Sequence, residues 1–129
     1  MPIRRLICIA YWAFLTLLLL APDPLALLGI ERICTGPGSI GVHFSFFVVL
    51  AVVVMAAQLN LRSVVLLAIL VAYAIATEAL QWLVPGRTVE LEDLIENLLG
   101  LGAGVAIWWI ARRCFARKRG SRSTARWAR

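Results

Sequence analysis

Long runs of apolar residues are the feature that most limits what this chain can fold into. The first, from Leu6 to Ala21, reads LICIAYWAFLTLLLLA, and comparable runs begin after His43, after Ser63 and after Asp93. Of the 129 residues, 62% are hydrophobic and 16% are charged, whereas a soluble domain is about half apolar and about a quarter charged. A chain of this size has too much surface to hide such a surplus in its own interior. The sequence therefore predicts an integral membrane protein, whose surroundings are themselves apolar.

The character of these runs predicts helices rather than strands. Strands of membrane β-barrels alternate apolar and polar residues, and these runs do not alternate. We expect four membrane spans at about residues 5–21, 43–59, 63–82 and 93–110, separated by the breakers PDP, NLR and PG. The predicted fold class is all-α, an integral membrane antiparallel four-helix bundle formed by residues 1–110 and followed by a basic cytoplasmic tail at residues 111–129.

The first run also has the layout of a cleaved signal peptide, because Arg4 and Arg5 precede an apolar middle. Cleavage requires a small residue three positions before the cut, whereas the end of this run, LLAPD, offers a leucine there and a proline afterwards. We therefore favour a retained helix. Removal of the segment would leave the orientation of the later spans unchanged.

Positive charge is concentrated at the end of the chain. Eight of the thirteen Lys and Arg residues lie within residues 112–129, where there is no acid. This block directly follows an apolar span and lacks interleaved aromatic residues, so we predict contact with anionic lipid headgroups and not with nucleic acid. Arg4, Arg5 and Arg62 fall on the same side of a four-span topology. Both termini are therefore expected in the cytoplasm.

The cysteines give no sign of a metal or redox site. Cys8, Cys34 and Cys114 lie far apart, and no C-x-x-C spacing occurs. We predict no disulfide, no metal and no cofactor.

The segment from Glu78 to Gly100 carries five of the seven acids of the chain. In the predicted topology, the ends of the second, third and fourth spans place six polar residues on one side of the membrane, the outer side. These six residues form the predicted polar or ligand-binding site: His43, Glu78, Gln81, Arg87, Asp93 and Asn97. A carboxylate such as Glu78, inside a span, costs about 2–3 kcal/mol and needs a partner, for which Arg87 is the predicted choice.

Helical spacing groups some of these residues on common faces. Glu78 and Gln81 are three residues apart, and Asp93, Asn97, Gly100 and Gly104 follow one another by four, three and four. Gly100 and Gly104 form a small-xxx-small pair, which is typical of closely packed membrane helices. We predict that the third and fourth spans pack along this stripe, so that Glu78, Gln81, Asp93 and Asn97 face one another.

Structural interpretations compete with this functional one. Asp93 has the properties of a helix N-cap, His43 those of an interfacial or structural residue, and Glu78 with Arg87 those of a structural ion pair. Gly100 and Gly104 are expected to serve packing alone. Glu90 and Glu92 are expected to form a solvated loop face.

These motifs resemble those of the VanZ-like family of small multi-pass bacterial membrane proteins. The likeness rests on the patterns E-x-x-Q-x-x-x-P-G-R from Glu78 and E-D-x-x-x-N-x-x-G-x-x-x-G from Glu92, with H-F at His43. It covers roughly residues 41–110 and places the family's polar positions on the six residues of the predicted site. Many members carry Asp-Lys where this chain has Ser39 and Ile40.

The resemblance implies a location in the bacterial cytoplasmic membrane and a role at the cell envelope, since the founding member is associated with teicoplanin resistance. It attaches no reaction to the family. The sequence leaves three interpretations open: a site that binds a lipid-linked or glycopeptide-like ligand among membrane lipids, an enzyme that acts on a lipid headgroup, and an assembly protein whose polar residues only join helices. It leaves the oligomeric state undetermined.

Overall fold

The computed structural model describes residues 3–21, 41–84 and 91–124, with side chains up to Phe115 in the last helix. Every regular element in these ranges is a helix, which confirms the all-α prediction. The four helices are α1 (Ile3–Leu20), α3 (Val42–Ala56), α4 (Ser63–Gln81) and α5 (Leu91–Thr124). They overlap the four apolar runs from which the helices were predicted.

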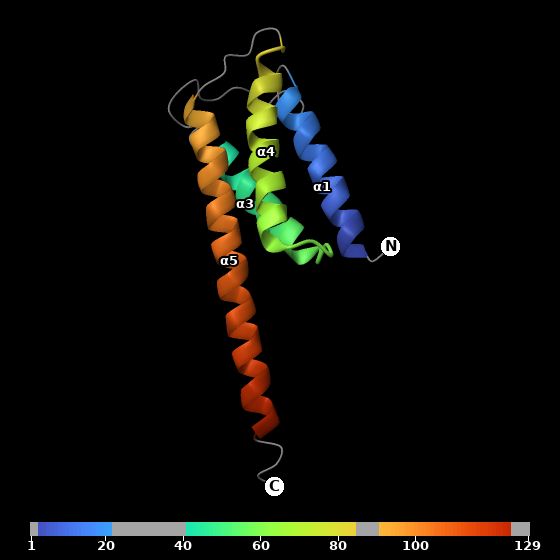
Figure 1. The fold of residues 1–129 in the computed structure, drawn as a ribbon, viewed down its shortest axis with the longest axis vertical. Helices are drawn as coiled ribbons and strands as arrows, with labels where there is room; N and C mark the ends of the chain where they lie inside the picture. The colour runs from blue at the N-terminus through green and yellow to red at the C-terminus, as the bar shows by residue number, and fades with distance from the viewer. Residues whose placement is uncertain (1–2, 22–40, 85–90, 125–129) are drawn as a thin grey trace.

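The helices alternate in direction along the chain (Figure 1). α1 and α4 run one way, and α3 and α5 run the other way. Helices that are adjacent along the chain are therefore antiparallel, whereas α3 and α5 are parallel to each other.

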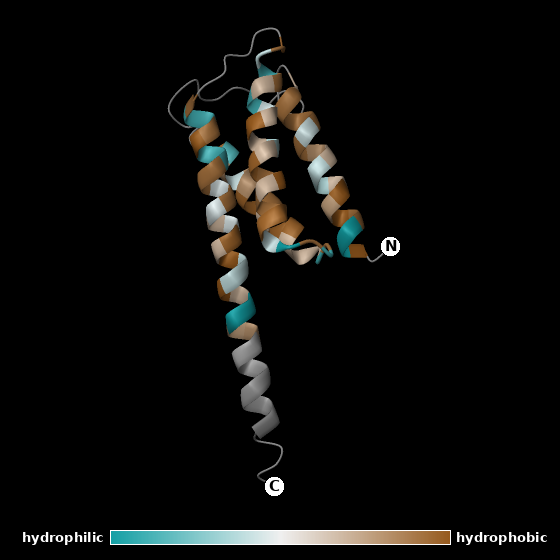
Figure 2. Ribbon diagram, viewed as in Figure 1, coloured by the Kyte–Doolittle hydropathy of each residue, from teal (hydrophilic) through white to brown (hydrophobic). Residues whose placement is uncertain are grey.

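The outer faces of the bundle are apolar, because many large hydrophobic side chains are exposed, and Figure 2 shows that hydrophobic residues predominate in the helices. Leu17 is 72% exposed and Val64 is 78% exposed, and many other large apolar side chains share this position. Three helices, α1, α4 and the Leu91–Phe115 part of α5, are long and apolar enough to cross a membrane, and α3 is a shorter apolar helix. The lipid therefore supplies the apolar surroundings that the chain itself does not.

α3 ends at Ala56, earlier than the predicted end of the second span at residue 59. Gln58 adopts a left-handed conformation with φ of 49°, and the N–H of Ala57 completes the last turn by donating to the carbonyl of Val53 at 2.9 Å. A left-handed residue directly after a helix is a common way of ending it, although glycine usually occupies that position. A short connection then leads to α4.

α5 continues well past Ile110, where the sequence predicted the span to end (Figure 1). The residues after Ile110 are Ala, Arg, Cys, Phe and Lys, which all tolerate a helix, and no glycine occurs before Gly120. The fourth helix therefore includes most of the segment that was predicted as a separate basic tail.

The interior is small and mainly aliphatic. Its large, fully buried apolar side chains come from all four helices: Leu15, Phe47, Leu50, Val54, Leu70 and Leu101. α1 adds polar contacts, because the Tyr11 hydroxyl donates to the Phe46 carbonyl at 2.9 Å and the Thr16 and Tyr73 hydroxyls lie 2.9 Å apart. Such interhelical hydrogen bonds fix the position of α1 against α3 and α4.

The closest packing joins α3 to α5, not α4 to α5. A Cβ atom added to Gly100 would collide with the carbonyl oxygen of Phe44, and one added to Gly104 would lie 2.5 Å from the carbonyl oxygen of Val48. Both pairs have the same sequence offset of 56, so the two helices lie in parallel register. The prediction that the glycine stripe packs against the third span was wrong. Spacing identifies which residues share a face, but not which neighbour that face meets.

Charge divides the bundle into two ends. The acidic end, where α4 finishes and α3 and α5 begin, carries every acid of the described residues: Glu78, Glu92, Asp93 and Glu96. The basic end, where α1 begins and α3 joins α4, carries the arginines whose side chains are described: Arg4, Arg5, Arg62, Arg112 and Arg113. Figure 2 shows these hydrophilic patches at opposite ends of an apolar middle.

Candidate functional site

Asn97 is the centre of a polar cluster at the acidic end. It is fully buried, and its Nδ2 donates to Oε1 of Glu78 at 2.7 Å. Its Oδ1 lies 3.3 Å from Nδ1 of His43. One asparagine on α5 thus joins a carboxylate on α4 to an imidazole on α3.

The local structure explains how these groups meet. Glu78 lies one turn before the end of α4, and His43 is the second residue of α3. α3 and α5 are parallel and start at the same end, so the first turns of both helices lie beside the last turn of α4. Glu78 is only 4% exposed, which is a costly position for a carboxylate among apolar helices. The hydrogen bond from Asn97 offsets part of this cost.

The hydrogen bonds of Asn97 also determine which nitrogen of His43 carries the proton. When Glu78 is ionised, its carboxylate only accepts, so the amide must direct Nδ2 toward Glu78 and Oδ1 toward His43. An amide oxygen also only accepts, and Nδ1 of His43 must therefore be the donor. The neutral ring then has its lone pair on Nε2.

Asp93 lies beside that second ring nitrogen. Its Oδ2 is 3.8 Å from Nε2 of His43, and the two side chains are 25% and 15% exposed. This distance exceeds that of a hydrogen bond. The two side chains form an ion pair only when both nitrogens of the His43 ring carry a proton. The most accessible part of the cluster therefore consists of an imidazole nitrogen and a carboxylate side by side.

Asp93 does not cap α5. The helix begins at Leu91, and Asp93 lies inside the first turn with Glu92. The interpretation of Asp93 as an N-cap was wrong, because Asp93 lies after the start of the helix. An acid in the first turn still interacts favourably with the positive end of the helix dipole.

Glu96 has a contact that the sequence did not reveal. Its Oε2 accepts a hydrogen bond of 3.0 Å from the backbone N–H of Gly41, the residue that precedes α3. Gly41 has a φ of 109°, a left-handed conformation that suits glycine. Glu96 thus links α5 to the start of α3 and supports the position of His43. No side-chain pattern in the sequence indicated this role, because the partner of Glu96 is a backbone group.

Gln81 points to a different helix from the one predicted. Its Nε2 donates to the carbonyl of Leu19 at 3.0 Å. Leu19 belongs to the last turn of α1, whose carbonyls have no partner within the helix. Gln81 is fully buried and therefore joins α4 to α1, whereas the prediction had it facing Asp93 and Asn97.

Of the six predicted site residues, the structure brings four together: His43, Glu78, Asp93 and Asn97. Arg87 lies outside the described residues, as do Glu90, Ser39 and Ile40. The pairing of Arg87 with Glu78 stays a prediction.

Within the described ranges, no group of three or more His, Cys, Asp or Glu side chains is arranged to hold a metal ion. Cys8 is a buried free thiol and Cys114 an exposed one, and Cys34 lies outside the described residues.

The cluster and its helices fall within a known family. The VanZ/LLP1 family model matches residues 14–112, which include the whole of α3 and α4 and the polar start of α5. A comparison with curated proteins found no match, and a comparison with solved structures found none either. The match covers most of the chain, including the polar motif that begins at Glu78 and the polar and glycine motif that begins at Glu92. The chain is therefore a membrane protein that belongs to the VanZ/LLP1 family.

Proposed function

We propose that the polar cluster at the acidic end is a binding site on the outer face of the bacterial cytoplasmic membrane, and that it takes a lipid-linked or glycopeptide-like ligand of the cell envelope. The observation that carries this proposal is the continuous contact from Glu78 through Asn97 to His43, made by three different helices. Ionisable residues at membrane depth are expensive, and their usual justification is function.

The order of these residues suggests what the site does with its ligand. Glu78 and Asn97 hold the ring of His43 in one tautomer, and Nε2 and Asp93 are the groups nearest the surface. A ligand hydroxyl, amide or phosphate reaching this end meets an imidazole nitrogen that accepts or, once protonated, donates a hydrogen bond. Arg87, whose position in the sequence follows α4, would add positive charge for an anionic group.

The division of charge supports a proposed orientation in the membrane. The described arginines lie at the basic end, and positive residues concentrate on the cytoplasmic side of membrane proteins. We therefore assign the basic end, the N-terminus and the C-terminus to the cytoplasm.

Labelling of single cysteines tests this orientation. In a chain whose native cysteines are replaced by serine, Glu92→Cys reports on the acidic end, and a restored Cys114 reports on the basic end. Both positions are exposed. We expect a membrane-impermeant maleimide to label Glu92→Cys in intact cells and Cys114 only after permeabilisation. The reverse pattern would place the polar cluster in the cytoplasm and end the proposal.

Binding by purified protein tests the site itself. His43→Ala removes the imidazole from the surface of the cluster, and Glu92→Gln is the matched control, because Glu92 is an exposed neighbour of Asp93. We expect His43→Ala to weaken binding of teicoplanin or of a polyprenyl phosphate by about tenfold, the value of one charge-assisted hydrogen bond. Glu92→Gln should bind as the parent chain does.

Folded yield separates this proposal from a structural role. His43→Ala should retain the parent's yield of monodisperse protein, because the side chain lies at the rim of the bundle. If the yield falls in step with binding, the polar residues serve only to join helices.

A second function is favoured by the same geometry. An imidazole oriented through Nδ1, with Nε2 facing outward beside a carboxylate, is an arrangement suited to acid–base catalysis. The enzyme would then act on a headgroup of a lipid-linked substrate. Release of product from a polyprenyl phosphate by the parent chain, and its loss in His43→Ala, would distinguish turnover from binding.

A further inference from the structure

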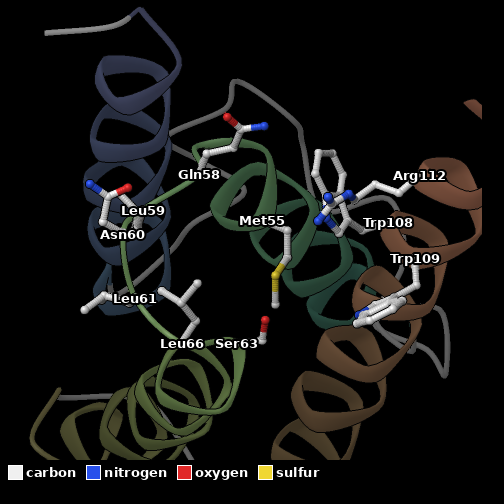
Figure 3. Close-up of a pocket in the computed structure, with 10 residues that line it drawn as sticks. All are labelled: Met55, Gln58, Leu59, Asn60, Leu61, Ser63, Leu66, Trp108, Trp109 and Arg112. Atoms are coloured by element: carbon white, nitrogen blue, oxygen red, sulfur yellow. The ribbon is translucent and has the colours of Figure 1, made fainter. Parts of the chain in front are cut away.

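A second polar site lies at the basic end, far from the cluster around Asn97. The connection between α3 and α4 meets α5 there and leaves a pocket of about 280 Å³. Figure 3 shows its lining, which comes from the end of α3, the connection, the start of α4 and the Trp108–Arg112 turn of α5. The polar cluster described above takes no part in it.

The polar lining consists of groups that can donate hydrogen bonds. Arg112 contributes a guanidinium group, Gln58 and Asn60 contribute amides, and Ser63 contributes a hydroxyl. Figure 3 shows the Arg112 side chain directed from α5 toward the end of α3. In the part of the chain that the structure describes, Arg112 forms no ion pair, and every acid lies at the opposite end of the bundle. The pocket is therefore suited to an anion.

The remaining lining is apolar and aromatic. Met55 and Leu66 line the pocket from α3 and α4, and Trp108 and Trp109 line it from α5. The neighbouring Arg113 stacks over the Trp109 ring at 5.8 Å. Tryptophan beside arginine at the end of an apolar span is typical of the level at which lipid headgroups lie. An occupant with an anionic head and apolar chains can contact both the polar and the apolar lining, whereas a free phosphate ion can contact only the polar lining.

The size of the pocket agrees with a headgroup rather than a whole lipid. Pockets that enclose a complete small ligand measure about 300–1,000 Å³, and this pocket lies just below that range and is open to its surroundings. The acyl chains would therefore remain outside, against the exposed apolar faces of α4 and α5.

We propose that this pocket binds the phosphate headgroup of an anionic phospholipid from the leaflet at the basic end, with Arg112 as the anion ligand. The site is discrete and differs from a diffuse attraction between the basic C-terminal segment and the membrane. It stands independently of the function proposed for the acidic end.

Native mass spectrometry of the full-length protein in neutral detergent tests this proposal. We expect the first phosphatidylglycerol to bind at least about fivefold more tightly than phosphatidylcholine. Both lipids carry a phosphate, but the choline cation of phosphatidylcholine cancels the net charge of its headgroup and weakens its attraction to Arg112. Arg112→Gln should weaken phosphatidylglycerol binding by about tenfold and phosphatidylcholine binding by less, so that the preference for phosphatidylglycerol falls. Arg112 is exposed, so the change should not disturb folding.

Arg4→Gln is the matched control. It removes the same charge at the same end, but from α1, where Arg4 is exposed and takes no part in the pocket. Its effect on phosphatidylglycerol should stay below about twofold. An equal loss in Arg4→Gln and Arg112→Gln would mean that only the overall charge matters and would overturn the discrete site. Displacement of the lipid by millimolar inorganic phosphate would overturn the lipid as occupant, in favour of a soluble anion.

Discussion

Gly100→Ala and Gly104→Ala are each expected to destabilise the folded protein by about 1–3 kcal/mol, the usual cost of forcing extra volume into a well-packed contact. In both cases the new methyl group would meet α3 backbone, at the carbonyl of Phe44 or of Val48. A backbone carbonyl cannot rotate away as the end of a long side chain can, so α3 and α5 would have to separate. The higher helix propensity of alanine recovers only about 0.5–1 kcal/mol of this cost.

Gly102→Ala is the matched control for these changes. Gly102 lies on the same helix between the two contact glycines, and a Cβ atom added there would meet nothing within 4 Å. It should be neutral or slightly stabilising. Thermal unfolding in detergent micelles, followed by the loss of monodisperse protein, measures all three variants. Equal unfolding temperatures for Gly102→Ala and Gly104→Ala would show that α3 does not pack on this stripe.

Asn97→Asp is expected to produce the second large loss of stability. The change keeps the shape of the side chain but places a carboxylate where the Asn97 amide now donates to Glu78 at 2.7 Å. A buried hydrogen bond is replaced by two acceptors, at a cost of about 1–3 kcal/mol from desolvation alone. The like charges add to this cost, because water is excluded from the position of Asn97.

Exchange of the two groups provides the decisive measurement. In the double variant Glu78→Gln with Asn97→Asp, the carboxylate and the amide change places, and one hydrogen bond between α4 and α5 can form again. We expect the double variant to be more stable than the sum of the two single changes by at least about 0.5–1 kcal/mol. Glu92→Gln, at an exposed carboxylate five residues before Asn97 on the same helix, should have little effect. Strict additivity of the two single changes would contradict a direct contact between Glu78 and Asn97.

Part of the site was predictable because helical topology controls depth. Once the apolar runs had been assigned to four alternating helices, His43, Glu78 and Asp93 had to fall at the same end. The spacing of four between Asp93 and Asn97 also placed both on one face of α5. These two facts account for the common depth of the residues, whereas the contacts of His43 with Asp93 and Asn97 also required α3 to pack against α5, which the sequence did not predict.

Other parts of the site depended on neighbours that the sequence does not specify. Gln81 was grouped with Glu78 because the two are three residues apart, yet its amide reaches the carbonyl of Leu19 on α1. Glu96 was not among the six predicted site residues, yet it binds the N–H of Gly41 ahead of α3. In both cases the partner is a backbone group, and side-chain patterns carry no information about where an unpaired backbone group from a distant segment will lie.

The sequence by itself determined the surroundings of this protein, the existence of its helices and the end of the bundle that holds its acids. These properties follow from hydrophobicity and chain direction, which act locally. Only the tertiary structure decided that the glycines of α5 meet α3 rather than α4. Lipid is as apolar as leucine, so burial gives one helix no preference for another inside a membrane. Close backbone approach and a few hydrogen bonds make that choice, and both exist only once the helices are together.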